Sequence, residues 1–136
     1  MMLFVWMYVC LLFSPTASQG QILLEIENVK KPTGVMRIGV YADEENYLKK
    51  AIHFQNVAVS ETGTMTVRLK GIPFGTYAIS LFHDQNGNGK LDSNWMRIPK
   101  EPYGFSQNAA ATFGPPKFEK AAFQHGQTTT ELKIKL

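Results

Sequence analysis

The stretch from Thr64 to Ser80, TMTVRLKGIPFGTYAIS, decides the fold of this chain. Apolar residues alternate with polar ones on both sides of a glycine- and proline-containing turn at residues 71–75. A period of two residues is typical of a strand that buries one face and exposes the other. The alternating residues are Met65, Val67, Leu69, Tyr77, Ile79 and Leu81. We therefore predict a β-hairpin here, with its apolar side against a core.

The same alternation recurs along the chain at roughly even spacing. We predict strands near residues 22–28, 35–41, 54–60, 64–70, 76–83 and 128–136. The polar stretch from Ala42 to Lys50 is expected to be a loop, with room for one helical turn. Several short strands without a convincing helix predict an all-β fold, an antiparallel β-sandwich of the transthyretin-like or immunoglobulin-like kind. Tyr77, Ile79 and Leu81 should face its core.

Composition sets the size and class of the molecule. The chain has 136 residues, of which 44% are hydrophobic and 18% charged, which suits one globular domain with a packed core. Fourteen basic and eleven acidic residues give a net charge of +3. The basic residues are scattered along the sequence, whereas a nucleic-acid binder concentrates them on one face. We therefore expect no nucleic-acid partner.

The first residues differ from the rest. Residues 1–13 are almost wholly apolar and are followed by small residues, a pattern that suits a secretory signal. We predict a signal peptide over residues 1–20, a mature chain that begins between Gln19 and Ile22, and one domain over residues 21–136. The product would be periplasmic or secreted, without stable membrane insertion. No Lys or Arg precedes Lys30, so the usual positive start of a signal is absent. A buried N-terminal strand or helix and a retained membrane anchor are the alternatives.

The single cysteine, Cys10, lies inside this apolar segment. Cleavage of the segment would leave a domain without thiols, which excludes disulfides and thiol catalysis. Tyr8 and Val9 precede Cys10, where a lipoprotein needs small residues, so lipidation is not expected.

Between Asp84 and Gly126 the alternation stops and Gly, Pro, Asn and aromatic residues dominate. We expect a long loop region without regular structure, and such regions are often functional. Its aromatic residues would either form a platform for a sugar or partner protein, or cover an open end of the sandwich. They are Trp95, Tyr103, Phe105, Phe113, Phe118 and Phe123.

The segment from Asp84 to Trp95, DQNGNGKLDSNW, matches the start of a calcium-binding loop of the EF-hand type. Side-chain oxygens would come from the first, third, fifth and ninth positions, the carbonyl of the seventh residue would add another ligand, and Gly89 would fill the sixth position. The predicted ligands are Asp84, Asn86, Asn88, Lys90 and Asp92.

The twelfth position of this loop holds Trp95, where a bidentate carboxylate normally completes the shell. Glu101 can replace it if the chain folds back. We expect a weak Ca²⁺ site, in the range of roughly 10⁻⁴ to 10⁻³ M for extracellular modules. Asp, Asn and Gly also dominate ordinary turns, so a metal-free turn remains the alternative.

Three strings in this region resemble an uncharacterised bacterial family, domain of unknown function 2141. They are HDQNGNGKLD at 83–92, IPKEPYGFS at 98–106 and FGPP at 113–116. The resemblance covers the chain from Ile22 onward and implies a small exported protein without an assigned reaction. The family motif often has Gly where Arg97 stands here. The loop is also similar to calcium-binding loops of surface-adhesin repeat domains, which implies a scaffold role.

No catalytic constellation is evident in the sequence. The histidines, His53, His83 and His125, are not at zinc-ligand spacing, and no nucleophile elbow is present. His83 is adjacent to Asp84 and either orients it or simply ends a strand. We therefore expect a calcium-stabilised scaffold or interaction module rather than an enzyme. The alternatives are a carbohydrate- or ligand-binding module that uses the aromatic loop and, less favoured, a small exported hydrolase.

Overall fold

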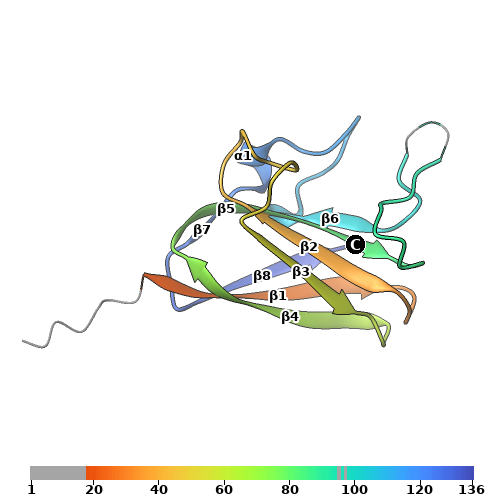
Figure 1. Ribbon diagram of the computed structural model, residues 1–136, viewed down its shortest axis with the longest axis horizontal. Coiled ribbons are helices and arrows are strands. Elements are labelled where there is room, and N and C mark those ends of the chain that lie inside the picture. Colours follow the sequence, from red (N-terminus) through yellow and green to blue (C-terminus); the bar gives the residue numbers. More distant parts are fainter. Residues whose placement is uncertain (1–17, 95, 97) are drawn as a thin grey trace, which may run out of the picture.

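Two β-sheets packed face to face form the body of the protein (Figure 1). The computed structural model describes residues 18–94, 96 and 98–136. Its strands are β1 (Gln19–Val29), β2 (Val35–Tyr41), β3 (His53–Ala58), β4 (Gly63–Pro73), β5 (Gly75–Asp84), β6 (Tyr103–Phe105), β7 (Phe123–His125) and β8 (Thr129–Lys135). A 3₁₀ turn, η1 (Ser106–Asn108), and a short helix, α1 (Phe118–Ala121), lie between β6 and β7. The predicted all-β sandwich is confirmed.

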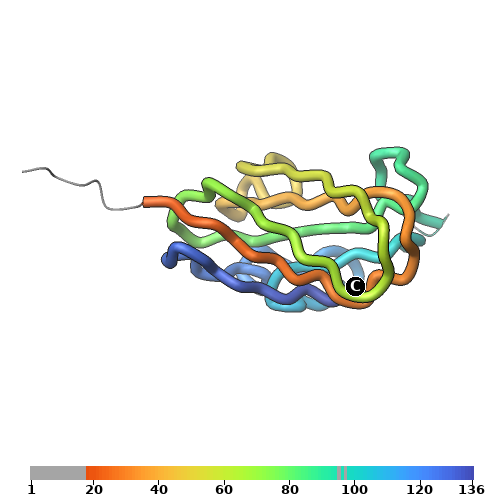
Figure 2. Tube along the Cα trace, turned by 90° about the horizontal axis from the view of Figure 1, so that it is seen from below, coloured from red at the N-terminus to blue at the C-terminus, as the bar shows by residue number. Residues whose placement is uncertain are grey.

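Sheet A has the strand order β4-β1-β8, and sheet B has the order β3-β2-β5-β6, with β7 also paired to β5. Figure 2 shows the three strands of sheet A side by side, with β1 between β4 and β8. The two strands predicted around the glycine-proline turn are present as β4 and β5, separated by a single residue, Phe74. They belong to different sheets, so they do not form the paired hairpin that we predicted. The chain instead crosses from one layer to the other at this turn.

The core lies between the two sheets and is built from the alternating residues of the sequence. Tyr77, Ile79 and Leu81 of β5 are at most 6% exposed, as predicted. Their counterparts in sheet A are equally buried, because alternate residues of β1 and β4 point to the same layer. These counterparts are Ile22, Leu24, Ile26, Val67 and Leu69.

Two further expectations from the sequence need correction. The pairing of β1 with β8 is parallel, so the sandwich is not wholly antiparallel. The region between Asp84 and Gly126 also contains regular structure, namely β6, η1, α1 and β7. These elements are only three or four residues long. Strands and helices of that length produce no detectable periodicity in the sequence.

Of these short elements, β6 and β7 extend sheet B, and α1 lies over its outer face, where a second apolar cluster lies (Figure 1). Ala78 of β5, Phe105 of β6 and Ala121 of α1 are buried in it, and Tyr47 and Phe118 pack against them. The hydroxyl of Ser106 fastens this layer to the sheet, because it accepts a hydrogen bond from the Ile79 N–H at 2.9 Å and donates to the Ala121 carbonyl. Sheet B is thus covered on both faces over part of its length.

Within the described ranges, no helix combines the length and the apolar character needed to cross a membrane. The predicted signal peptide lies almost wholly outside the described residues, which begin at Ser18. The Ser18 carbonyl accepts a hydrogen bond from the Phe74 N–H at 2.9 Å, and β1 begins with the next residue.

Candidate functional site

The polar loop, which we define as residues 84–101, begins where β5 ends. Asp84 is the last residue of β5 and is fully buried, on the outer face of sheet B. The Arg37 Nε in the neighbouring strand β2 donates to Asp84 Oδ2 at 2.7 Å. The backbone N–H of Gly89 donates to the same oxygen at 2.7 Å, and that of Asn88 donates to Oδ1 at 3.2 Å. Asp84 therefore ties the first turn of the loop to the sheet.

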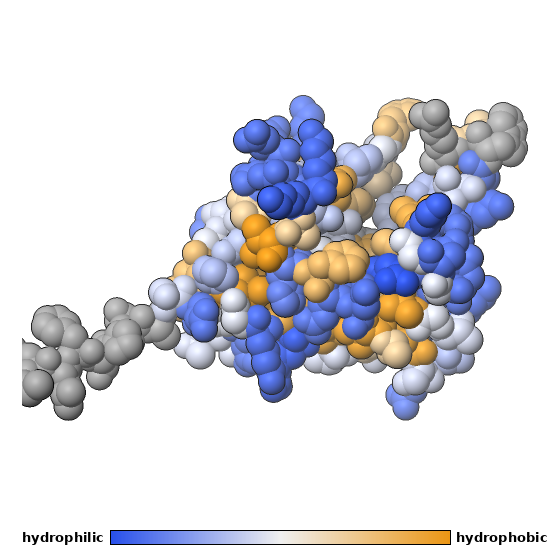
Figure 3. Space-filling model, viewed as in Figure 1, coloured by the Kyte–Doolittle hydropathy of each residue, from blue (hydrophilic) through white to orange (hydrophobic). Residues whose placement is uncertain are grey.

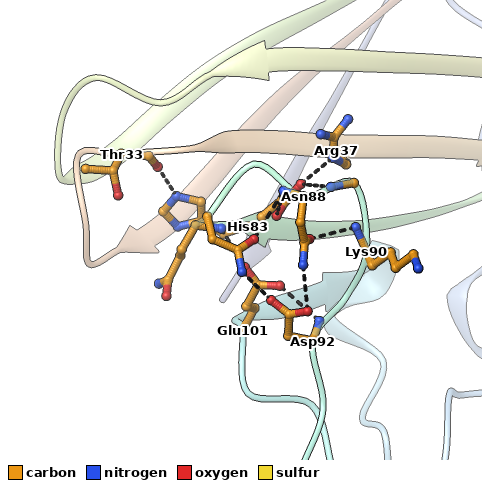
Figure 4. A network of polar contacts seen from close by, with 11 residues as sticks. Thr33, Arg37, His83, Asn88, Lys90, Asp92 and Glu101 are labelled. Carbon is orange, nitrogen blue, oxygen red and sulfur yellow. Dashed lines mark hydrogen bonds and ion pairs between the residues drawn. The ribbon is translucent and has the colours of Figure 1, made fainter.

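A second carboxylate, that of Asp92, organises the tip of the loop (Figure 4). The Asn86 amide nitrogen donates to Asp92 Oδ2 at 2.5 Å, and the Asn88 amide nitrogen donates to Oδ1 at 2.8 Å. The amide oxygens are engaged elsewhere, because Asn86 Oδ1 accepts from the Asn88 N–H and Asn88 Oδ1 accepts from the Lys90 N–H. Alternate side chains thus fold inward along the loop.

Glu101 closes the loop from its far end. It is only 6% exposed, and its two carboxylate oxygens accept from the backbone N–H groups of Gln85 at 2.6 Å and Asp92 at 3.0 Å. The chain therefore folds back beyond residue 98, which is the condition for Glu101 to take part in the loop. An additional contact holds this return, since the Lys100 N–H donates to the Asp92 carbonyl at 2.7 Å.

The side chains of five of the six predicted ligands thus belong to one hydrogen-bonded network, and they are Asp84, Asn86, Asn88, Asp92 and Glu101. Lys90 joins through its N–H, and its ammonium lies away from the network (Figure 4). Trp95, at the twelfth loop position, lies outside the described residues. The predicted grouping of side chains is therefore present, while their role as metal ligands stays a prediction.

The pKa values of Asp84 and Asp92 are both lower than usual. Burial by itself raises the pKa of Asp84, but the hydrogen bond from Arg37, with those from Gly89 and Asn88, outweighs it and holds this pKa below the usual value. The Asn88 and Asn86 amides lower the pKa of Asp92 in the same way. Both side chains are therefore anionic at neutral pH.

Carboxylates alone do not make a complete cation shell here. Over the described part of the chain, no group of three His, Cys, Asp or Glu side chains is placed to hold a metal ion. A hard cation such as Ca²⁺ also binds amide and carbonyl oxygens. Asn86 and Asn88 can supply such oxygens. Their amide nitrogens now face Asp92, and a rotation of each amide by half a turn would place its oxygen there instead.

The side chain of His83 serves the fold rather than the polar loop. Its imidazole points into the sandwich, and Nε2 is 2.6 Å from the Thr33 carbonyl, which makes Nε2 the protonated nitrogen because a carbonyl only accepts. Nδ1 is buried without a partner among the described residues. The side chain therefore fastens the turn between β1 and β2 to the end of β5.

An apolar groove lies beside the polar loop on the outer face of sheet B. Its cavity measures about 820 Å³, and Figure 3 shows the molecule hollowed between the loops that rise above this face. Phe113 is fully exposed there, whereas Phe105 and Phe123 are buried. The groove is lined by Leu48, Ser80, Leu91, Met96, Ile98, Pro99, Tyr103, Phe105, Ala111, Phe113, Gly114 and Pro115. The aromatic residues of this region therefore differ in exposure: Phe105 and Phe123 are buried, and the ring of Phe113 is exposed to solvent.

Sequence reasoning missed Arg37, which holds Asp84 in place. Its side chain is only 16% exposed, although the strand around it is apolar. A lone charged residue within an apolar strand is the signal that identifies such a partner, because a buried charge requires pairing.

The chain matches a protein-family model. The family model described as an uncharacterized protein conserved in bacteria, DUF2141, matches residues 24–133. No curated protein and no solved structure matches the chain.

Proposed function

Because the chain belongs to the DUF2141 family of uncharacterized bacterial proteins, we propose its function from its own site: an exported β-sandwich scaffold or interaction module whose polar loop is stabilised by calcium. The observation that carries this proposal is the single network of Asp84, Asp92 and Glu101 with two asparagine amides. The apolar segment at residues 1–13 supports export.

A cation at this loop would take the place that amide N–H groups now occupy at Asp92. Asn86 and Asn88 would turn their oxygens inward, and the Asp92 carboxylate would gain a charged partner. This rotation would break the hydrogen bonds that the two amide oxygens now accept from the N–H groups of Asn88 and Lys90. This cost favours weak affinity, roughly 10⁻⁴ to 10⁻³ M, which suits a calcium-containing medium outside the cell.

Thermal unfolding in chelator and in calcium tests the proposal. Calcium at about 100 times Kd should add roughly 2.7 kcal/mol to the free energy of unfolding. Asp92→Asn should abolish that increment without unfolding the domain, because Asp92 is only partly buried and can still accept hydrogen bonds through its amide oxygen.

Asp43→Asn is the matched control. Asp43 also accepts hydrogen bonds within a turn, from the N–H and the amide of Asn46, but it is remote from the polar loop in sequence. It should leave the calcium increment intact. A melting temperature that does not respond to calcium would make the loop an ordinary turn, already closed by its own hydrogen bonds.

A second candidate function is ligand binding at the apolar groove, favoured by the fully exposed Phe113. Its aliphatic lining, including Leu48, Leu91 and Ile98, suits an apolar ligand better than a sugar, which needs convergent polar groups. An apolar fluorescent dye, Nile red, tests it: emission should rise with the folded domain and fall with Phe113→Ser. Equal emission from the two proteins would exclude this site.

A further inference from the structure

Several large apolar side chains that line the apolar groove are exposed to solvent. Met96 is 59% exposed, Ile98 54%, Leu91 38% and Leu48 37%, and all of them line the same space as Phe113. Single exposed apolar residues are ordinary, but several around one concavity mark a binding surface. The volume of about 820 Å³ is within the range of small-molecule sites.

Two of these residues have a backbone conformation that is unfavourable for their side chains. Leu48 has φ of 58° and Phe113 has φ of 60°, in the left-handed region where glycine and asparagine are common and bulky apolar residues are rare. Such a backbone conformation is strained, and it indicates a constraint other than local stability. Both strained residues line the groove.

A basic pocket adjoins the groove. Lys30, Lys100 and Lys135 reach it from three separate segments, and its cavity measures about 740 Å³. None of the three lysines forms an ion pair with another described residue. The acidic side chain in this lining is Glu101, and both of its oxygens already accept backbone N–H groups. Among the described residues, no ion pair engages these three lysines, and they outnumber the one acidic side chain of the lining.

The two cavities share one wall, made by Pro99, Tyr103, Phe105 and Ala111. Tyr103 and Phe105 lie on the outer face of β6, and their rings contact edge to face with centroids 6.0 Å apart. A molecule that spans these shared residues would meet an apolar environment on one side and a cationic one on the other. We call the two adjacent cavities together the cleft.

We propose that this cleft binds a single-chain anionic amphiphile of the fatty-acid type, with its hydrocarbon chain in the apolar groove and its carboxylate at the three lysines. The proposal rests on the second candidate function and names its ligand class. The chain buries the exposed side chains, and the carboxylate gives the lysines a charge partner. A sugar would match only the polar end, and a neutral hydrocarbon only the apolar end.

Isothermal titration with decanoate, kept below its micelle concentration, tests the proposal. Decanoate should bind about tenfold or more tightly than 1-decanol, which has the same chain without charge, and acetate should not bind. If decanol and decanoate bind equally while Nile red binding persists, the groove takes apolar ligands but this proposal is wrong. If neither decanoate nor Nile red binds, the second candidate function fails as well.

Variants separate the two ends of the cleft. Phe113→Ser should weaken decanoate and decanol alike, while the double change Lys30→Glu and Lys135→Glu should weaken decanoate alone. Phe54→Ser and Lys70→Glu are the matched controls, because both residues are exposed and neither lines the cleft. Circular dichroism checks that each variant is folded.

Vesicles of phosphatidylglycerol distinguish a free ligand from a membrane surface. Cosedimentation with vesicles in the absence of any binding to monomeric decanoate would overturn the proposal and assign the exposed side chains to a lipid surface. Binding to decanoate that the lysine variants leave unchanged would also overturn it, because the carboxylate would then lie elsewhere.

Discussion

The Arg37 Nε lies 2.7 Å from Asp84 Oδ2, and this pair joins two neighbouring strands to the polar loop. Arg37 is 16% exposed and Asp84 is fully buried, so solvent screens the pair only slightly. Two backbone N–H groups of the loop complete the shell around the carboxylate. This ion pair therefore helps to fix the position of the loop on sheet B.

Arg37→Met should lower the free energy of unfolding by about 3 kcal/mol, because it leaves the Asp84 carboxylate buried without its cation. Adding Asp84→Asn should recover part of the loss, with a coupling of about 1 to 3 kcal/mol in a double-mutant cycle measured by urea denaturation. Lys133 and Glu25 provide a control pair, 3.7 Å apart and largely exposed. Lys133→Met should cost about 0.5 kcal/mol or less. Strictly additive changes at Arg37 and Asp84 would contradict the assigned pairing.

Stability should fall in acid because of Asp84. Its folded pKa lies below the ordinary value, so the unfolded chain binds a proton first as the pH falls. The contribution is fully present above the unfolded pKa of about 3.9 and is lost as the pH falls through the folded pKa. Asp92 acts in the same direction. Urea midpoints between about pH 7 and pH 3 measure the effect, and Asp84→Asn should flatten the curve.

Ser106→Ala should destabilise the outer layer of sheet B. Loss of the hydroxyl removes the acceptor for the Ile79 N–H and the donor to the Ala121 carbonyl, in a fully buried position. An unsatisfied buried group costs about 1 to 3 kcal/mol. Thermal unfolding measures the loss, and amide exchange at Ile79 should accelerate. Unchanged exchange there would show that water replaces the hydroxyl.

Gly104→Ala tests how closely β6 approaches the last strand. A Cβ at Gly104 would lie 2.6 Å from Ile134 Cγ2 and 3.3 Å from the Lys135 carbonyl oxygen. Such overpacking costs about 1 to 3 kcal/mol. Gly126→Ala is the control, because a Cβ there meets nothing within 4 Å. Chemical denaturation of both variants should show a loss only at Gly104.

Processing should preserve β1. A cut after Ser18 keeps the whole strand, whose first residues, Gln19 and Gly20, pair with Pro73 and Ile72 of β4. A cut after Gly20 removes only these two pairs. We therefore expect N-terminal sequencing of exported protein to give a first residue between Gln19 and Ile22. A product that retains Met1 would contradict the predicted signal.

The sequence predicted most of the sandwich because local alternation marks each long strand. It did not predict that β1 pairs with β8, since nothing near Gln21 indicates a partner at Thr129, 108 positions away. Glu101 was expected at the loop because the twelfth position lacked a carboxylate. Arg37 was not, because its contact with Asp84 depends on the order of strands in sheet B.

The parallel pairing of β1 with β8 also determines when the chain can fold during synthesis. Ile134 in β8 is fully buried in the core, so the core is incomplete until β8 has been synthesised. Contacts between distant segments form slowly, because loop closure precedes any gain from packing. A growing chain therefore leaves one edge of β1 without its partner until residues 129–135 are made. During this delay the unfolded chain can bind chaperones, and it can also aggregate.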